Sequence, residues 1–215
     1  MKPGQPYQRF PTASRWRERI VLRDGRELLL RPIEPADIEP IRHGFVLLDP
    51  EEVRMRYQHP VKWLDEAYLQ RLVHPRRGQD FTLVLAEPLP PGQALVGAVA
   101  RMARTPGTDD MEFAILVSHY LAGRGLGRLL LSKLIARARR SGMRAIHGDV
   151  LIGNEPMLRL AQALGFRRLP SDDAGMVRVQ LPLRPARDAS PATPAPPTQD
   201  ITPASAARSA DSTST

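Results

Sequence analysis

The sequence predicts an α/β (α+β) fold, and three observations support this prediction. An apolar run at Met111–Val117 is followed by a glycine-rich turn and a long amphipathic stretch, which is typical of a buried strand that leads into a helix. Other short apolar runs alternate with stretches of helical periodicity along the chain. The chain has 215 residues, of which 42% are hydrophobic, so it can form one domain with a substantial core.

The stretch from Met111 to Arg140 carries most of the functional information. Its first run is apolar apart from Glu112, and Gly123, Gly125 and Gly127 lie where the helix should begin. Leucines then recur at helical spacing as far as Ser141, which with the next glycine is a plausible stop. Unpaired N–H groups and the positive end of the helix dipole favour an anion at such a helix start, and a phosphate is the obvious candidate.

The glycine turn does not fit the best-known nucleotide-binding motifs. It is neither G-x-x-x-x-G-K-[ST] nor a full G-x-G-x-x-G, because Leu130 stands at the third position after Gly127. No acidic residue follows at the distance that a ribose-binding Rossmann unit needs. From the turn alone, phosphate binding and simple close packing of helix on strand both remain open.

The remaining elements follow from periodicity and turn signals, beginning with a hairpin at Asp24-Gly25. We expect the other strands and helices at the following places: strands at Ile20–Leu22, Glu27–Arg31, Phe81–Ala86, Leu95–Arg104 and Ala145–Leu151; helices from Pro35 to Leu47, from Pro50, over Asp65–Val73 and over Pro156–Leu164; and a closing hairpin of Arg167–Leu169 with Met176–Leu181.

Composition predicts three parts along the chain. Residues 1–18 contain three prolines among polar residues and are expected to form a flexible N-terminal segment. Residues 19–183 form the domain. Residues 184–215 are rich in Pro, Ala, Ser and Thr and too poor in apolar residues to pack, so we expect a disordered tail.

Composition also excludes several classes of protein. The chain has no cysteine, which excludes disulfide scaffolds, thiolate zinc sites and cysteine nucleophiles. It shows no secretory signal and no apolar run of membrane-spanning length, so we expect a cytoplasmic protein without a membrane partner. The net charge of +8 comes almost entirely from arginine, and the few aromatic residues are not interleaved with a basic patch. A nucleic-acid partner is therefore unlikely, and an anionic cofactor or an acidic protein face explains the charge as well.

Four motifs in order resemble those of the GNAT superfamily of N-acetyltransferases. They are the strings Leu28-Leu29-Leu30-Arg31-Pro32-Ile33-Glu34-Pro35-Ala36-Asp37, Ala122-Gly123-Arg124-Gly125-Leu126-Gly127, Asn154-Glu155-Pro156-Met157-Leu158 after a strand, and Ala163-Leu164-Gly165-Phe166. The ordered combination is far more specific than any one motif. The resemblance covers about residues 20–183 and is closest to the GNAT domains of bacterial protein lysine acetyltransferases.

The resemblance implies a mixed, mostly antiparallel sheet flanked by helices. The cofactor cleft is expected between two splayed parallel strands, Met111–Val117 and Ala145–Leu151. It also implies direct transfer of an acetyl group from acetyl-CoA to an amine, with a protein lysine as the first choice and no metal. Two alternatives stay open: transfer to a small-molecule amine or a protein N-terminus, and a non-catalytic acyl-CoA-binding regulatory module.

Glu112 is the candidate general base. A lysine amine has an unperturbed pKa near ~10.4 and must lose a proton before it can attack, so a carboxylate nearby would promote the reaction. Glu112 shares a strand face with Ala114 and Leu116, and the related acetyltransferases carry their general-base glutamate in the same Glu-Phe-Ala string. A solvated glutamate at the entrance of the strand is the alternative.

The resemblance also implies a set of cofactor-binding residues. Backbone groups at the strand end would pair with the pantetheine amides, N–H groups of the turn would cradle the pyrophosphate, and two arginines would add positive charge. These residues are Ile115, Val117, Ala122, Gly123, Arg124, Gly125, Leu126, Gly127, Arg128 and Asn154. Asn154 could equally be a plain helix cap.

The chain departs from the family pattern at two positions. Ala122 replaces the usual Gln or Arg, and Ala161 stands where many members carry a tyrosine that protonates the leaving thiolate. No tyrosine follows Tyr120, so the general acid is unassigned. The helical region after the first motif would form one wall of the acceptor cleft, with His43, Arg54, Arg56, Tyr57 and His59 as candidate contacts.

Overall fold

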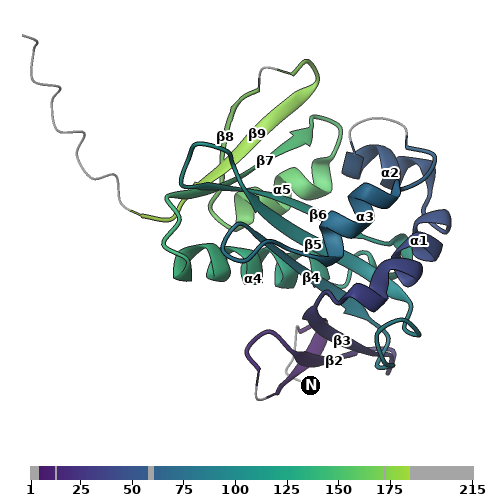
Figure 1. The fold of residues 1–215 in the computed structure, drawn as a ribbon. Helices are drawn as coiled ribbons and strands as arrows, with labels where there is room; N and C mark the ends of the chain where they lie inside the picture. Colours follow the sequence, from purple (N-terminus) through teal and green to yellow (C-terminus); the bar gives the residue numbers. More distant parts are fainter. Residues whose placement is uncertain (1–4, 13, 58–60, 172, 185–215) are drawn as a thin grey trace, which may run out of the picture. The chain divides into compact units, whose positions relative to one another are not determined.

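The described residues form one sheet with helices on both faces. The computed structural model describes residues 5–12, 14–57, 61–171 and 173–184. Nine strands within them lie in the order β1-β2-β3-β4-β5-β6-β7-β9-β8 (Figure 1). Their bounds are β1 Tyr7–Pro11, β2 Glu18–Leu22, β3 Glu27–Pro32, β4 Asp80–Ala86, β5 Val96–Arg104, β6 Asp110–Val117, β7 Ala145–Leu151, β8 Arg167–Pro170 and β9 Met176–Pro182.

Every neighbouring pair of strands is antiparallel except β6 and β7, which are parallel. The predicted mixed, mostly antiparallel sheet is therefore confirmed, as are the hairpin of β2 and β3 and the closing hairpin of β8 and β9. Gly25 adopts φ 82° in the first of these turns. Each predicted strand agrees with the observed one to within two residues at either end.

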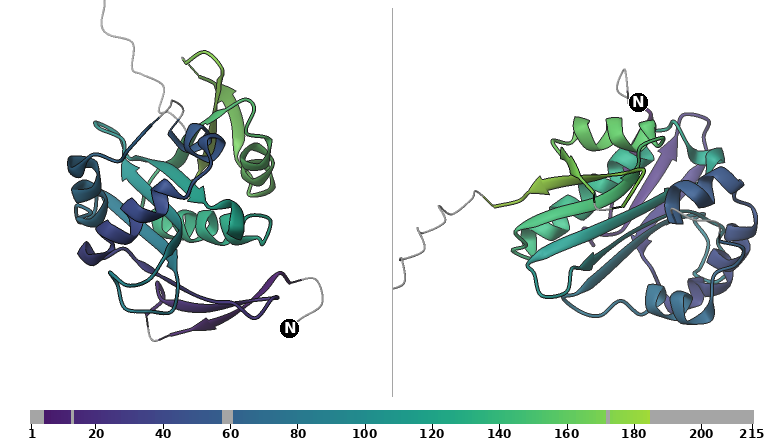
Figure 2. Two further views of the ribbon diagram at one scale, coloured as in Figure 1. Left: turned by 90° about the vertical axis from the view of Figure 1, so that its right-hand side faces the viewer. Right: turned by 90° about the horizontal axis from the view of Figure 1, so that it is seen from above.

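Alternation along the strands divides the core between the two faces of the sheet. On β4, Leu83 and Leu85 pack in one cluster, whereas Val84 and Ala86 pack in the other. The first cluster contains the buried residues of α4 (Leu126–Arg140) and α5 (Glu155–Ala163). The second contains those of α1 (Ile38–Val46), α2 (Pro50–Tyr57) and α3 (Glu66–Val73). Figure 2 shows this separation of the helices by the sheet.

The helices begin and end close to the predicted residues. The expected start at Pro35 is a short 3-10 helix, η1 Pro35–Asp37, that continues into α1. Asp65 caps α3 by accepting the N–H of Tyr68 at 2.6 Å. Helix α4 ends at Arg140 with Ser141 as its cap, followed by Gly142 at φ 70°. Another 3-10 helix, η2 His119–Leu121, leads from β6 into the glycine turn.

The expectation of a flexible segment over residues 1–18 is wrong for its described part, because Tyr7–Pro11 forms strand β1 at the edge of the sheet. Arg9 donates to both carboxylate oxygens of the buried Glu18, at 2.7 and 2.9 Å, and Lys133 of α4 also bonds this carboxylate. A polar edge strand of this kind has no apolar alternation for sequence reasoning to find. Of the predicted tail, residues 185–215 lie outside the described residues, as do 1–4 and 13.

A buried ion pair fixes the chain between β3 and α1. Arg31 donates to both oxygens of Asp37 at 2.6 and 2.7 Å, and both side chains are fully buried. Asp37 also accepts the N–H of Glu34 at 2.8 Å. The Arg-Pro-Ile string therefore has a structural role in this chain. Among the described residues, no helix is long and apolar enough to cross a membrane.

Candidate active site

The two parallel strands are paired only over their first residues. Asp110, Met111 and Glu112 of β6 are in register with Ala145, Ile146 and His147 of β7. Beyond this last rung β6 remains paired with β5 as far as Val117, and β7 with β9 as far as Leu151, but β6 and β7 no longer pair with each other. The predicted splay is therefore confirmed, and Glu112 lies at its apex.

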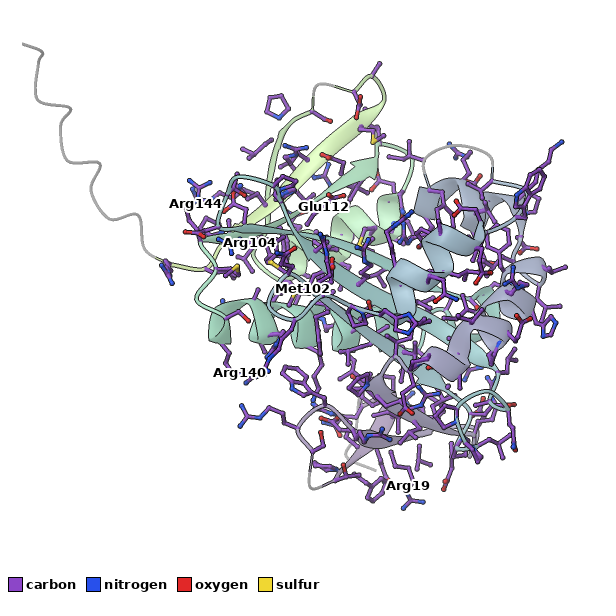
Figure 3. All side chains as sticks on the ribbon, viewed as in Figure 1. Arg19, Met102, Arg104, Glu112, Arg140 and Arg144 are labelled. Carbon is purple, nitrogen blue, oxygen red and sulfur yellow. The ribbon has the colours of Figure 1, made fainter. Side chains whose placement is uncertain are left out.

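Gly148 allows the strands to stay close just before they separate. A Cβ on this residue would lie 3.0 Å from the ring of Phe113 and 3.1 Å from its carbonyl oxygen. Phe113 is buried on the α4 face, where its ring meets that of Phe166 edge-on at 5.5 Å. Glu112, the preceding residue, therefore lies on the opposite face, which α1, α2 and α3 cover further along the sheet. Figure 3 labels Glu112 on β6.

A polar hollow of about 150 Å³ occupies the splay. Glu112 and Ala114 contribute to it from β6, Asp149 from β7, and Arg56 and Tyr57 from α2. Asp149 is held by Arg178 of β9, which donates to both of its oxygens at 2.9 and 2.6 Å. Two carboxylates thus lie at the apex: Glu112, which is exposed, and Asp149, which is paired with Arg178.

A groove of about 750 Å³ continues from this hollow to the glycine turn. The two share Met55 and Arg56 of α2, Ile115 of β6, and Asn154 and Met157 at the start of α5. The groove falls in the size range of ligand pockets, about 300–1,000 Å³. Its far end is formed by the turn and the first residues of α4, which has no acidic residue in its first turn.

The two glycines of the turn have similar backbone conformations and different surroundings. Gly123 has φ +71°, and a Cβ there would meet nothing within 4 Å. Gly125 has φ +73° and precedes α4, and a Cβ there would lie 3.0 Å from Cγ of Pro6 and 3.5 Å from the ring of Tyr7. The absent side chain of Gly125 therefore makes room for the N-terminal strand. Both glycines satisfy a left-handed conformation that other residues adopt at a cost.

The comparisons with known proteins agree with this geometry. Residues 27–167 match the family model described as the acetyltransferase (GNAT) domain. The chain belongs to the GNAT acetyltransferase family. Within it, the chain is 29% identical over 160 residues to an acetyltransferase of Pseudomonas aeruginosa, which covers 73% of this chain and 84% of that protein.

Two further similar proteins carry the names Pat and PAT. The acetyltransferase Pat of Mycolicibacterium smegmatis is 30% identical over 168 residues, which are 77% of this chain and 49% of Pat, so the match spans about half of Pat. The crystal structure of the GNAT domain of S. lividans PAT superposes with a TM-score of 0.68 at 26% identity and covers 80% of this chain and 99% of that domain. The resemblance inferred from the motifs is thereby confirmed.

Most of the cofactor residues expected in this GNAT domain line one groove. The set comprises Ile115, Val117, Ala122, Gly123, Gly125, Leu126, Gly127, Arg128 and Asn154. Arg124 is the exception, because its guanidinium bonds Asp24 in the β2–β3 turn at 2.8 Å. Arg26, from the same turn, donates to the carbonyl of Tyr120 at 3.4 Å. Arg124 therefore ties the glycine turn to the N-terminal hairpin, and Arg128 is the described arginine of the turn that faces the groove.

Helix α5 contributes a cap and an apolar wall. Asn154 accepts the N–H of Met157 at 3.1 Å, so its interpretation as a helix cap is confirmed. Asn154 also lines both the polar hollow and the groove. Ala161, at the position of the absent tyrosine, is fully buried in the α4 core cluster. Tyr57 of α2 lines the polar hollow instead, and burial raises the pKa of its hydroxyl.

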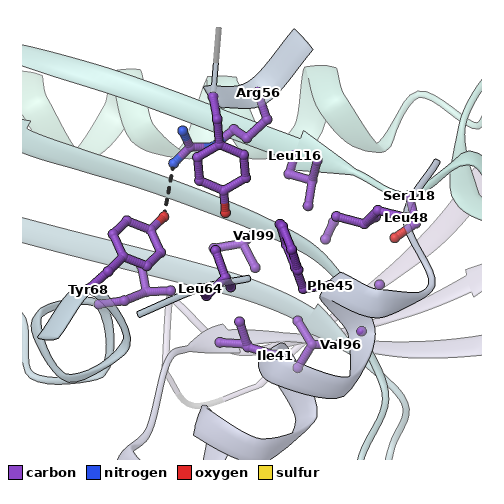
Figure 4. A pocket seen from close by; sticks show the side chains of 15 residues that line it. Ile41, Phe45, Leu48, Arg56, Leu64, Tyr68, Val96, Val99, Leu116 and Ser118 are labelled. Carbon is purple, nitrogen blue, oxygen red and sulfur yellow. Dashed lines mark hydrogen bonds between the residues drawn. The ribbon is translucent and has the colours of Figure 1, made fainter. Parts of the chain in front are cut away.

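An apolar cavity of about 30 Å³ lies beside the apex, beneath α1, α2 and α3 (Figure 4). Leu116 and Val99 form its floor from the sheet, and Phe45 of α1 covers it. Arg56 lines this cavity, the polar hollow and the groove, and its Nη2 donates to the Tyr68 hydroxyl at 3.3 Å. Of the other predicted acceptor contacts, Arg54 is bonded to Glu51, and His59 lies outside the described residues.

Helix α2 is fastened to the end of β6 by one carboxylate. Glu52 accepts two hydrogen bonds from His119, one from its backbone N–H at 2.5 Å and one from Nδ1 of its ring at 3.0 Å. Glu52 also accepts the backbone N–H of Asp49 at 2.8 Å. The hydrogen bond that His119 donates to Glu52 raises the pKa of His119. We call this contact the Glu52–His119 clasp. It holds the α2 wall of the groove beside the glycine turn, and neither residue was singled out from the sequence.

Proposed function

We propose that this GNAT domain transfers the acetyl group of acetyl-CoA to the side-chain amine of a protein lysine, with Glu112 as the general base. The observation that carries the proposal is the position of Glu112. It lies at the last rung of the parallel pair, where the hollow between the splayed strands joins the groove to the glycine turn. A base at this apex can reach an amine that approaches the thioester end of a bound cofactor.

The groove suits acetyl-CoA at both ends. The N–H groups at the start of α4, the positive end of its dipole and the Arg128 side chain would hold the pyrophosphate. Backbone groups of Ile115 and Val117, left unpaired on the β7 side by the splay, would pair with the pantetheine amides as an added strand does. Acetyl-CoA supplies an activated acyl group, and the chain's part is to orient it, remove the amine proton and exclude water.

The carboxylates at the apex favour a cationic acceptor. An ammonium group entering the hollow meets Glu112 and Asp149, whereas the phosphate end of the groove has no acidic residue in the first turn of α4. A lysine side chain fits because its charge sits at the end of a thin apolar stem. The relatives named Pat and PAT support a protein acceptor. A cytoplasmic location fits this role.

Labelled acetyl-CoA distinguishes this proposal from its alternatives. The protein is incubated with labelled acetyl-CoA and a bacterial lysate, and the acetylated sites are mapped by mass spectrometry. Label on lysine side chains supports the proposal, and label on α-amines or only on small molecules supports the alternative acceptors. Binding of acetyl-CoA by calorimetry without any transfer would support a non-catalytic regulatory module.

Glu112→Gln is the matched control, because it keeps the size of the side chain and removes the base. Sites that are labelled equally by this variant arise from uncatalysed acetylation and are discounted. Binding of acetyl-CoA should be the same for both proteins, since Glu112 lines the polar hollow and not the groove that reaches the glycine turn.

A further inference from the structure

His147 is a buried ring directly beside the proposed base. It is 6% exposed and pairs with Glu112 in the last rung of β6 and β7. Paired residues on neighbouring strands point to the same face, so the imidazole and the carboxylate are neighbours on the face away from α4. The site as described so far uses Glu112 and leaves His147 without a role.

One nitrogen of this ring is bonded and the other is not. Nε2 lies 2.9 Å from Oγ1 of Thr105, the first residue after β5. Nδ1 is buried and has no hydrogen-bond partner among the described residues. A buried polar atom left unpaired costs stability, so a ring whose only task was to support the turn would be expected to bond both nitrogens.

The surroundings keep the ring neutral. Burial lowers the pKa of His147, and Arg178 of β9 lowers it further, while Glu112 and Asp110 of β6 and Asp149 of β7 act in the opposite direction. A neutral imidazole can accept a proton at one nitrogen and release one at the other.

Thr105 connects the ring to the outside of the sheet. It lines an open hollow of about 460 Å³ at the β5–β6 turn, together with Arg76, Arg104 and Thr108. Figure 3 shows Arg104 and Arg144 gathered at this edge. The hollow shares no lining residue with the groove or with the polar hollow at Glu112. It would stay open to water when the groove is filled.

We propose that His147 and Thr105 form a proton outlet for Glu112. The inference rests on the proposed function, because an acceptor held against Glu112 covers the exposed side of this carboxylate.

The acceptor ammonium gives a proton to Glu112, Glu112 gives one to Nδ1 of His147, and the ring releases one from Nε2 past Oγ1 of Thr105 to water in the outer hollow. One proton thus leaves the amine and one reaches solvent. Between turnovers the cleft is open: Nδ1 returns its proton through Glu112 to water in the cleft, and Nε2 regains one past Oγ1 of Thr105, which restores the first tautomer. His147 and Thr105 are positioning residues, since they act through Glu112.

The test compares kcat in single and double variants with saturating acetyl-CoA and a lysine peptide labelled by the wild-type protein. We expect His147→Gln to lower kcat about tenfold, less than removal of the base itself, and to leave the KM for acetyl-CoA unchanged. In the Glu112→Gln background the same change should have no further effect on kcat, because the outlet has no proton to carry. His74→Gln, at an exposed histidine after α3, is the matched control and should keep the wild-type kcat.

Variants of the Thr105 hydroxyl test the proposal even if His147→Gln does not fold. Thr105→Val should lower kcat, and Thr105→Ser, which keeps the oxygen, should restore it. A wild-type kcat in folded His147→Gln or in Thr105→Val would overturn the outlet. It would also be overturned if His147→Gln lowered kcat by the same factor in the wild-type and in the Glu112→Gln backgrounds. In each of these cases the proposed function stands, since the loss in Glu112→Gln remains. Absence of transfer by the wild-type protein would instead remove the proposed function.

Discussion

The two ends of the groove differ in charge and in the kind of group that carries it. At the apex the charges are carboxylates on side chains, Glu112 and Asp149, in a hollow of about 150 Å³. At the glycine turn the positive character comes from backbone N–H groups, the α4 dipole and Arg128. Arg56 also lines the hollow, and Glu51 and Glu52 line the groove, so the clearer difference is in the kind of group: side chains at the apex and backbone at the turn. We therefore expect changes at the apex to alter mainly the rate of transfer, and changes at the turn to alter mainly the affinity for the cofactor.

Replacing the apex carboxylate should have the largest effect. Glu112→Gln should lower the rate of transfer by on the order of a hundredfold at neutral pH, which is typical for loss of a general base. The loss should shrink as the pH rises towards the amine's own pKa near ~10.4, because the acceptor then loses its proton without help. Rates measured from pH 6.5 to 9.5 beside calorimetry of acetyl-CoA check both parts. A near-normal rate at neutral pH would return Glu112 to the solvated-surface interpretation.

The glycine pair tests the other end of the groove. Gly123→Ala and Gly125→Ala should each lose about 1–2 kcal/mol of stability, because both force a side chain into the left-handed region. Only Gly125→Ala should also disturb the N-terminal strand, since its Cβ would press on Pro6 at 3.0 Å. Thermal melts and hydrogen exchange over β1 separate the two variants. Equal protection of β1 in both would contradict the packing that the structure shows.

A larger side chain at Gly125 tests how the turn keeps its shape. The structure directs a side chain there towards Pro6 and Tyr7. If affinity for acetyl-CoA falls in Gly125→Val, the cause is a displaced turn. Affinity that is kept in a folded Gly125→Val protein would show that the turn holds its shape without the glycine.

Two arginines of the turn form a second matched pair. Arg128→Gln should raise the Kd for acetyl-CoA about fivefold, or about 1 kcal/mol, as expected for one partly exposed charge, and the effect should weaken in high salt. Arg124→Gln should change the Kd less, because that guanidinium is bonded to Asp24 at 2.8 Å. Titrations at low and high salt measure both. A larger loss in Arg124→Gln would mean that its bond to the hairpin matters more to the turn than a direct charge does.

The strand, the glycine turn and the helix after it could be predicted because their signals are local, whereas the splay and the role proposed for Glu112 were implied by the resemblance to the family. An apolar run, three spaced glycines and a leucine repeat can be recognised without knowing the partner strands. The roles of Gly125 and Arg124 could not be predicted, because Pro6 and Asp24 meet the turn from a hundred or more residues away in the sequence. Strand β1 was missed for the same reason, since its stability depends on Glu18 and Lys133 rather than on its own pattern.

His147 was missed although it lies in a correctly predicted strand. Ala145–Leu151 was expected from its apolar residues, and a histidine within such a run gives no sign of which residue faces it. The register of the parallel pair places it beside Glu112, and Thr105 is brought to it across 42 positions of sequence. Register between parallel strands is set by the whole crossover connection, which no local motif encodes.

The Glu52–His119 clasp should give the smallest effect, and it acts between the two ends of the groove. The hydrogen bond that the His119 ring donates to Glu52 raises the pKa of His119, so the charged form is favoured in the folded protein. The contribution of charged His119 to stability is fully present below the unfolded pKa of about 6.5 and is lost as the pH rises through the higher folded pKa.

The Tm of wild type should therefore exceed that of His119→Gln at pH 6, and the difference in Tm should narrow by pH 8. It need not vanish, because a neutral His119 ring can still hydrogen-bond Glu52 through Nδ1. The backbone bond from His119 to Glu52 is kept in the variant and cancels in the comparison. His74→Gln serves as the control for an exposed histidine whose ring faces a carbonyl at 3.1 Å rather than a carboxylate. A difference in Tm that is the same at both pH values would show that the charge of His119 contributes nothing to the clasp.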